Sequence, residues 1–343
     1  MNNNEGIHVK EARHCLLCGD EGDILYSGLR DRLFDAPGIW SLMQCPKCQL
    51  VWLNPRPAAD DIGKLYANYF THEIPNNQNR NGGLRRVVKA SILQSSYGYR
   101  IDGANRVMGS ALSYVGPLKA IVCSSVRWLE AHEGGRLLDV GCGNGRFLDQ
   151  MRQLGWEVTG VEPDGAAVSV AREKLGLQVF EGSLEEARLP GSHFDAITMN
   201  HVIEHVPDPI GTLRECHRVL RPGGKLVVST PNIRSMGFQV FGEYWRGLEV
   251  PRHLHLFCPQ SLRIAAEHAG LRVMELRTTA RSARWMYASS SCIRRDGTLP
   301  GGSSERTEAL LRLQGLGFLA QEHGLRGPRE AGEEIVMVAG RRG

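Results

Sequence analysis

Between residues 136 and 232 the sequence alternates short apolar runs with amphipathic runs, and this alternation restricts the fold more than any other feature. The apolar runs RLLDV at 136–140, WEVTGVE at 156–162 and FDAITMN at 194–200 are typical of buried strands. RFLDQMRQL at 146–154 has helical spacing between the first two. Strands that alternate with helices form a mainly parallel sheet covered by helices on both faces. We therefore expect an α/β, Rossmann-like fold.

Further segments extend this pattern to a sheet of seven strands. The additional strand candidates are LQVF at 177–180, GKLVVST at 224–230, LRVMELRTTA at 271–280 and EEIVMVAG at 333–340, with helices at 166–176, 209–220 and 259–270. The section 281–304, with SSS and GGSS, predicts a loop between the last helix and the final strand.

Three zones divide the 343 residues, and together they predict the domain organisation. Residues 1–57 hold paired cysteines and two short apolar stretches, and they end in the Pro-bracketed NPRP. Residues 58–133 have mostly helical patterns, including DDIGKLYANYF from residue 60, and predict a helical lid or linker. Residues 134–343 form the α/β domain. The N-terminal sequence has no signal-peptide core and the chain no long apolar run, so we expect a cytoplasmic protein without a membrane span.

A glycine-rich loop joins the first strand of the α/β domain to its helix. Gly141, Gly143 and Gly145 let the backbone approach a ligand closely, and the helix that follows supplies free N–H groups. Asp139 precedes the first glycine by two residues, where its carboxylate can organise the loop and bind an ammonium group. Glu162 closes the second strand, placed to accept both hydroxyls of a ribose. Glycines alone also fit a dehydrogenase, but the two carboxylates favour a different nucleoside cofactor.

Five segments in order resemble the class I S-adenosylmethionine methyltransferases, particularly their ubiquinone-methyltransferase-like branch. The segments are LLDVGCGNG, VTGVEPD, EGSLEEARLP, HVIEHVPDP and LRPGGKLVVSTPN. The resemblance implies that S-adenosylmethionine is the cofactor, held by Asp139, the three glycines, Glu162 and Asn200. Where this family often has an Asp beside the adenine the chain has Ser183, so backbone groups of Ser183 and Leu184 are expected there instead.

Histidines cluster where the acceptor would meet the methyl donor. A hydroxyl nucleophile must lose its proton, and histidine is the usual base near neutral pH. His201 and His205 follow the fourth strand, while His253 and His255 lie in WRGLEVPRHLHLF. We expect His253 to be the general base, with His201 or His205 as second choices. Each of these histidines is equally compatible with a packing role.

The acceptor is only partly constrained by the residues around these histidines. Arg252 and Trp245 could hold an acidic or sugar-like acceptor or simply pack the loop. The stretch NHVI stands where amino methyltransferases often carry [ND]-P-P-[YF], which favours O-methylation while leaving N- and C-methylation open.

Two C-x-x-C pairs in the first zone have the spacing of zinc knuckles. The four thiols are Cys15, Cys18, Cys45 and Cys48. Four thiolates without an open position predict a structural zinc ribbon, and disulfides are disfavoured in a cytosolic chain. This module resembles the zinc-binding domain that precedes some sugar C-methyltransferases.

These observations predict a methyltransferase for a small-molecule acceptor such as a sugar, nucleotide sugar or natural product. An alternative is a zinc-ribbon-guided ribosomal-RNA base methyltransferase. It is disfavoured because residues 1–57 carry six basic against seven acidic side chains, so they form no basic face by composition. A second alternative is a non-catalytic adaptor that binds the cofactor.

Overall fold

The computed structural model describes residues 2–66, 83–299 and 330–341, and its centre is a seven-stranded sheet. The strand order is β13-β14-β11-β10-β7-β8-β9. The strands are β7 (Arg136–Val140), β8 (Glu157–Glu162), β9 (Val179–Glu181), β10 (Phe194–Asn200), β11 (Leu220–Pro231), β13 (Leu271–Thr279) and β14 (Glu334–Arg341). Five neighbouring strands are parallel, and β14 runs antiparallel to both β11 and β13. The expected α/β class and the seven strands are confirmed.

Successive residues of each strand point to opposite faces of the sheet, so each strand contributes to two hydrophobic cores. Leu138 packs in the core under α6 (Pro209–Val219) and α8 (Pro259–His268), whereas Leu137 packs in the core on the other face. That second core is closed by α1 (Gly83–Tyr97), α3 (Gly116–Ser124) and α4 (Arg146–Gln153), with α2 (Arg106–Leu112) against α1 and α5 (Gly165–Leu175) beside β8 and β9. The sheet is therefore buried on both sides.

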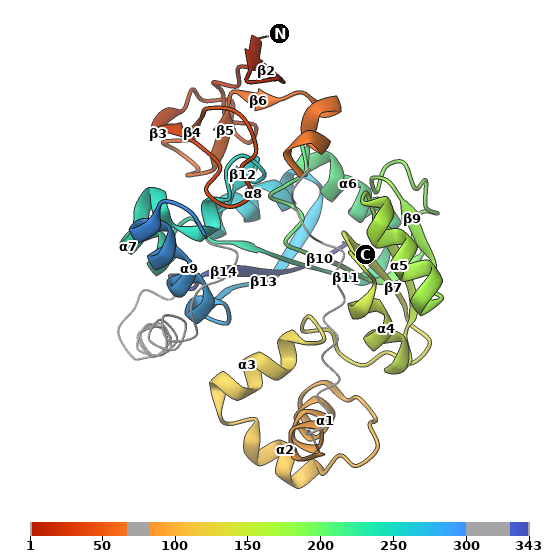
Figure 1. The fold of residues 1–343 in the computed structure, drawn as a ribbon. Coiled ribbons are helices and arrows are strands. Elements are labelled where there is room, and N and C mark those ends of the chain that lie inside the picture. Colours follow the sequence, from red (N-terminus) through yellow and green to blue (C-terminus); the bar gives the residue numbers. More distant parts are fainter. Residues whose placement is uncertain (1, 67–82, 300–329, 342–343) are drawn as a thin grey trace.

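The segment expected to form a lid begins with a 3-10 helix, η1 (Ala59–Tyr66), and continues after residue 82 with α1, α2 and α3. These three helices lie on one side of the sheet, far from the N-terminal strands (Figure 1). Part of the expected helix from residue 60 falls on residues 67–70, outside the described ranges. A role as a lid over the acceptor stays a prediction.

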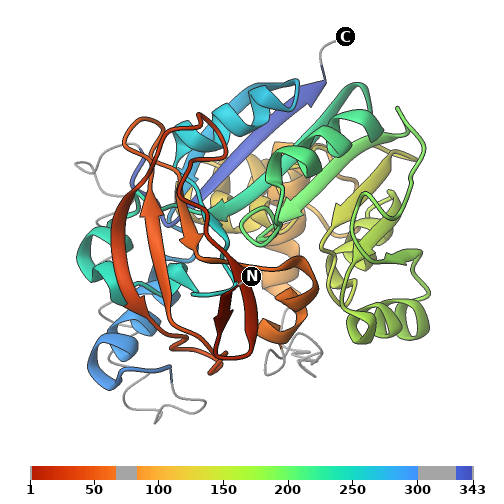
Figure 2. The ribbon, with the colours of Figure 1, turned by 90° about the horizontal axis from the view of Figure 1, so that it is seen from above.

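The N-terminal segment forms two small sheets at one end of the molecule (Figures 1 and 2). One holds β1 (Asn2–Asn4), β2 (Ile7–Lys10) and β6 (Arg56–Pro57). The other has the order β12-β5-β4-β3, with β3 (Asp23–Leu29), β4 (Trp40–Gln44), β5 (Val51–Asn54) and β12 (His255–Leu256). Since β12 lies about 200 residues after β5 in the chain, the second sheet is built from two distant parts of the sequence.

One local expectation was wrong. The segment expected to be a loop from residue 281 contains a helix, α9 (Ala283–Asp296), and residues 300–304 of it lie outside the described part of the chain. Buried Met286, Ser290 and Ile293 are spaced by three or four residues along this helix, so small serines at core positions concealed its apolar face. The strand expected at 224–230 begins earlier in the structure: Leu220 already pairs with Phe194 where α6 ends, and the register then shifts before Lys225 pairs with Ala196.

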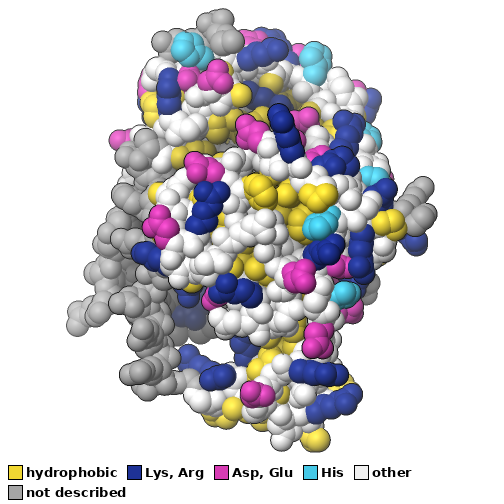
Figure 3. Space-filling model, turned by 90° about the vertical axis from the view of Figure 1, so that its right-hand side faces the viewer, with side chains coloured by type: hydrophobic (Ala, Val, Ile, Leu, Met, Phe, Trp, Pro, Cys, Tyr) yellow, Lys and Arg dark blue, Asp and Glu magenta, His cyan; other side chains and the backbone are white. Residues whose placement is uncertain are grey.

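Short elements that follow β11 complete the fold near the edge of the sheet at which the parallel strands end. They are α7 (Met236–Phe241), η2 (Gly242–Tyr244) and η3 (Arg246–Leu248). In the described ranges, no helix is long and apolar enough to cross a membrane. On the face shown in Figure 3, acidic and basic side chains are interspersed, so no single-sign patch covers it.

Candidate active site

The loop from β7 to α4 needs its glycines for two different reasons. Gly141, Gly143 and Gly145 all have positive φ, at 68°, 55° and 80°, in the region that L side chains rarely adopt. A Cβ at Gly141 would lie 2.3 Å from Cγ2 of Val202, so this backbone packs against the segment that follows β10. A Cβ at Gly143 would meet no described atom within 4 Å. This part of the loop is open to a ligand.

Asp139 lies in β7 beneath this loop and is completely buried. Its Oδ1 accepts a hydrogen bond from Thr198 Oγ1 at 2.8 Å and contacts the Arg127 guanidinium. Its Oδ2 is buried and has no hydrogen-bond partner among the described residues. Burial raises the pKa of this carboxyl, while Arg127 and Thr198 oppose the rise. An unpaired carboxylate oxygen fits the expected ammonium of the cofactor, which would supply the missing donor.

Glu162 ends β8 and ties the glycine loop to the next turn. Its two carboxylate oxygens accept the backbone N–H groups of Gly143 at 2.8 Å and Asp164 at 3.0 Å. Each carboxylate oxygen has a second lone pair, so the group can still accept two ribose hydroxyls. Burial raises the pKa of Glu162, and the two N–H bonds partly offset that rise. The position of Glu162 is therefore compatible with its expected role of accepting the ribose hydroxyls.

Ser183 and Leu184, expected at the adenine, follow β9. Leu184 is buried, whereas Ser183 is exposed and its N–H donates to Glu186 Oε2 at 2.7 Å. Asn200 is half-buried at the carboxyl end of β10. These residues thus occupy the same sheet edge as Asp139 and Glu162, at the ends of parallel strands where α/β sheets bind ligands.

Arg127 is a site residue that no sequence pattern predicted. It follows α3, has a φ of +48°, and donates to Thr198 Oγ1 at 2.9 Å while stacking over Phe147 at 3.7 Å. This arginine therefore compensates the buried Asp139 charge. The sequence carries one usable signal, an arginine next to a tryptophan just before the first strand. The Arg127–Asp139 pair itself spans twelve residues of mostly irregular chain, so no periodicity predicts it.

His201, directly after β10, is held between two carboxylates. Its Nδ1 lies 3.2 Å from Glu204 Oε1 and its Nε2 lies 3.5 Å from Glu334 Oε1. Burial alone would lower the pKa of His201, but the two carboxylates reverse this and raise it to about 10. The same pairing lowers the pKa of Glu204 to about 2 against the effect of burial. At neutral pH this pair is therefore an imidazolium and a carboxylate.

His205 and His253 form a second, closely packed histidine pair. Their ring centroids are 4.7 Å apart and the rings meet edge to face. The Nδ1 of His253 lies 2.8 Å from the Gly247 carbonyl oxygen, and the Nδ1 of His205 lies 3.1 Å from the Arg252 carbonyl oxygen and 3.0 Å from the Tyr66 hydroxyl. Carbonyls only accept, so both Nδ1 atoms carry hydrogen and both Nε2 atoms keep a lone pair when the rings are neutral. Burial and the neighbouring His205 lower the pKa of His253 to about 4.

The other residues considered for the acceptor pack the loop instead. Trp245 is 2% exposed, and its indole N–H donates to Glu333 Oε2 at 2.9 Å. Arg252 is 1% exposed and is paired with Asp31 and Glu249. His255 is fully buried in β12. Of the two interpretations left open for Arg252 and Trp245, the contacts support packing.

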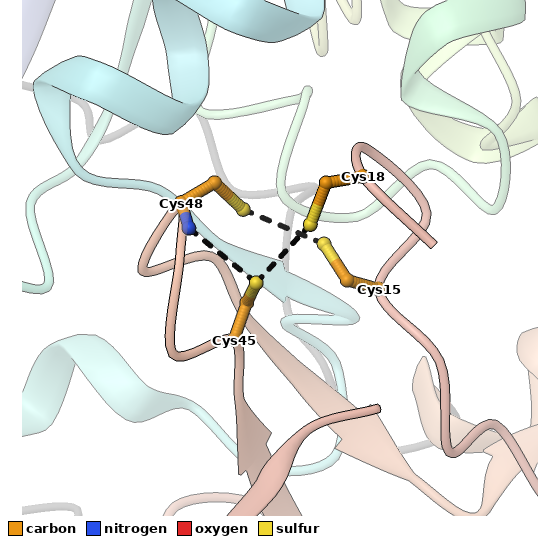
Figure 4. Close-up of side chains that lie close together, drawn as sticks. All are labelled: Cys15, Cys18, Cys45 and Cys48. Atoms are coloured by element: carbon orange, nitrogen blue, oxygen red, sulfur yellow. Dashed lines mark hydrogen bonds between the residues drawn. The ribbon is translucent and has the colours of Figure 1, made fainter. Parts of the chain in front are cut away.

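The four paired cysteines converge into one cluster, as Figure 4 shows. All their sulfur atoms lie within 4.8 Å of one another, with Cys15 and Cys48 at 3.4 Å and Cys18 and Cys45 at 3.3 Å. A zinc ion with Zn–S bonds near 2.3 Å would hold sulfurs roughly 3.8 Å apart. The N–H groups of Leu17 and Cys48 point at Sγ of Cys15 and Cys45, each at 3.4 Å. This donor set suits four thiolates.

A nearby arginine also fits a negatively charged cluster. Arg56 lies in β6, its Nε is buried without a hydrogen-bond partner among the described residues, and burial lowers its pKa. Cys15 is the group that opposes this lowering. A zinc ion with four thiolates has a net charge of −2 and would compensate this half-buried cation.

Comparisons with known proteins agree with this geometry. A family model described as a methyltransferase domain matches residues 120–276. The Ubiquinone biosynthesis O-methyltransferase of Stutzerimonas stutzeri (strain A1501) is 31% identical over 175 residues, covering 47% of this chain and 75% of that protein. The enzyme of the same name from Pseudomonas aeruginosa (strain LESB58) is 34% identical over 178 residues, with the same coverage of both chains.

Among solved structures, an S-adenosylmethionine dependent methyltransferase from Mesorhizobium loti aligns with 65% of this chain and 98% of that one, at 19% identity and a TM-score of 0.44. The family assignment depends on the sequence relatives, of which this chain covers three quarters, and on the order of the strands and the carboxylates at their ends. This chain belongs to the class I S-adenosylmethionine-dependent methyltransferases.

Proposed function

We propose that the protein transfers a methyl group from S-adenosylmethionine to an oxygen atom of a small-molecule acceptor. The observation that carries this proposal is the edge of the sheet where the unpaired Oδ2 of Asp139 and the carboxylate of Glu162 flank the open position at Gly143. The names of the relatives, which are O-methyltransferases, support oxygen as the acceptor atom.

In this proposal each end of the cofactor has its own contacts. Asp139 accepts the ammonium, Glu162 accepts the ribose hydroxyls, and backbone groups of Ser183 and Leu184 contact the adenine. The loop glycines Gly141, Gly143 and Gly145 line the cofactor, and Asn200 lies beside them. The bound sulfonium is an already activated methyl donor, so the chain's own residues need only align the acceptor, exclude water and accept its proton.

The proton of the acceptor hydroxyl goes to a histidine in this mechanism. We retain His253 as the first candidate, since its lowered pKa keeps its Nε2 unprotonated at neutral pH. His205 is the second, because its ring is only half-buried and contacts His253. His201 is already protonated at neutral pH and so cannot accept the proton there, but its charge can orient an acceptor oxygen.

We infer that the acceptor is a sugar, a nucleotide sugar or a related natural product, and that Cys15, Cys18, Cys45 and Cys48 bind a structural zinc ion. The resemblance of the cysteine module to that of sugar-modifying methyltransferases motivates the first inference. The sulfur cluster and the buried Nε of Arg56, which has no hydrogen-bond partner among the described residues, support the second.

The test is a methyl-transfer assay with isotopically labelled S-adenosylmethionine and a panel of sugars, nucleotide sugars and phenols. We expect a labelled O-methyl product with one of these classes. The matched control is Glu162→Ala, which should abolish both cofactor binding by calorimetry and product formation. Cofactor binding without any methylated product across the panel would favour the adaptor alternative, and metal analysis of the purified protein should find one zinc per chain.

A further inference from the structure

A buried ion pair joins residues 1–57, which we call the cysteine module, to the segment that carries His253. The Arg252 guanidinium donates to both carboxylate oxygens of Asp31, with Nη1–Oδ2 at 2.7 Å and Nη2–Oδ1 at 3.0 Å. Both side chains are completely buried. Such a two-pronged pair fixes the orientation of the guanidinium as well as its position.

Both partners of this pair have additional fixed contacts. Asp31 also accepts backbone N–H groups from Leu33 and Ala36, each at 2.9 Å, so its own loop is held in place. Arg252 also donates through Nε to Glu249 Oε1 at 3.2 Å and lies over the ring of Phe34. The guanidinium is therefore held by contacts on its edge and on its face.

The backbone of Arg252 transmits this constraint to the histidine pair. Its carbonyl oxygen is the acceptor 3.1 Å from Nδ1 of His205, and the next residue is His253. On the other side, the N–H groups of Leu254 and His255 both donate to the Glu204 carbonyl at 2.8 and 3.1 Å. His255 then pairs with Trp52 in the module's sheet. The segment is thus clamped between the module and the loop after β10.

A second ion pair between the same two regions provides a natural comparison. Arg32 of the module donates to Glu243 Oε2 at 2.7 Å and to the Glu243 carbonyl at 3.0 Å. This pair anchors the segment at Glu243, ten residues before His253. If both ion pairs only anchored the segment to the module, the loss of either pair would affect the histidines equally. Of these two pairs, the Asp31–Arg252 pair is the one whose arginine contacts His205, through the Arg252 carbonyl oxygen.

We propose that Asp31 is a positioning residue for the His205–His253 pair and acts through Arg252. The proposal rests on the proposed function, in which these histidines accept the acceptor's proton. Asp31 holds the Arg252 backbone where its carbonyl keeps hydrogen on Nδ1 of His205, so that Nε2 is the atom with the free lone pair. The cysteine module thereby sets the tautomer of a histidine on another part of the chain.

The charges around the pair indicate what its loss would do. Burial would raise the pKa of Asp31, but Arg252 and the backbone N–H groups lower it below its ordinary value, so the residue is ionised. Without that charge, Glu249 would be the carboxylate still facing Arg252, and Arg246 already donates to Glu249 at 2.5 Å. We expect the Arg252 guanidinium to move toward Glu249 and its carbonyl to move away from His205.

The experiment is NMR of the full-length protein labelled with ¹⁵N-histidine, comparing Asp31→Asn with the wild type. We expect the Nδ1 and Nε2 signals of His205 to shift toward a mixture of tautomers, with a smaller change at His253. Cofactor affinity, measured by calorimetry, should change less than about twofold because Asp139 and Glu162 are untouched. The matched control, Glu243→Gln, removes the neighbouring ion pair and should leave the histidine signals in place.

Two further variants keep the test informative. Asp31→Glu retains the charge and should restore the wild-type signals in part. If Asp31→Asn does not fold, Arg252→Lys retains the charge but loses the planar fork, and it should produce the same shift in His205. Unchanged His205 signals in a folded Asp31→Asn protein, or equal shifts in Glu243→Gln, would overturn the proposal. A failure of the methyl-transfer proposal would appear separately, as absent cofactor binding or product in the wild type.

Discussion

At the scale of one residue, Asp139 is the buried carboxylate that we propose binds the ammonium of the cofactor. One carboxylate oxygen is committed to Thr198 and Arg127, and the other is unpaired among the described residues. We predict that Asp139→Ala weakens S-adenosylmethionine binding by roughly 30-fold or more, since removing one partner of a buried charge pair costs about 2 kcal/mol or more. Calorimetry measures this directly.

Arg127 supplies the control for that measurement. In Arg127→Met the Asp139 carboxylate remains but is buried without its cation, so we expect a large loss of stability, of about 3 kcal/mol. If Asp139→Ala left cofactor affinity unchanged while Arg127→Met destabilised the protein as expected, Asp139 would have a purely structural role.

His201 gives a prediction about pH. Its pKa of about 10 in the folded protein exceeds the ordinary value of 6.5, so its ion pairs stabilise the fold fully below about pH 6.5. That contribution is lost as pH rises toward and through about 10. Histidine NMR should show His201 titrating near pH 10, and His201→Gln should remove this part of the pH dependence of unfolding. A midpoint near 6.5 would contradict the two-carboxylate pairing. The side chain is 36% exposed, so solvent screens the effect on stability.

At the scale of elements, two glycines in the loop between β7 and α4 are needed for different reasons. Gly143 is needed for its backbone conformation alone, whereas Gly141 is also needed because a side chain would have no space. Gly143→Ala should cost about 1 kcal/mol, the strain of a left-handed L-residue, because its Cβ meets nothing described. Gly141→Ala should cost at least about 1 kcal/mol more, because its Cβ would overlap with Val202. Urea denaturation of the two variants measures the difference. Equal losses would mean that Val202 can move aside freely.

The sequence predicted those elements whose signals are local. The strands β7, β8 and β10 and helix α5 were expected almost to the residue, because apolar runs and a terminal glycine mark their limits. Helix α9 was missed because serines occupy its buried positions. Asp139 and Glu162 follow from their positions at strand ends. The contacts Arg127–Asp139 and Asp31–Arg252 were missed because they depend on how irregular segments pack, and no pattern along the chain records that.

At the scale of the whole molecule, the cysteine module and the sheet share one hydrophobic core. Cys45, Leu50 and Trp52 pack in the same cluster as Leu138 and Leu262. We therefore predict that a chelator lowers the melting temperature of the entire protein in a single transition. The expected drop exceeds about 5 °C, since each kcal/mol shifts the melting temperature by roughly 2 °C in a chain of this size.

Calorimetry with and without chelator tests this, with Cys123→Ser as a control cysteine outside the cluster. Two separate transitions, with only the first sensitive to the chelator, would show that the module unfolds independently of the sheet.

The pairing of β12 with β5 has a consequence for how such proteins can be recombined. Residues 255–256 complete a sheet whose other strands come from the first 54 residues, and Arg252 is seated against Asp31. The N-terminal module therefore cannot be exchanged between related enzymes by joining chains near residue 57 alone. A working graft must also transfer the matching segment around residues 245–258, because that segment supplies both β12 and Arg252, which contact the N-terminal module.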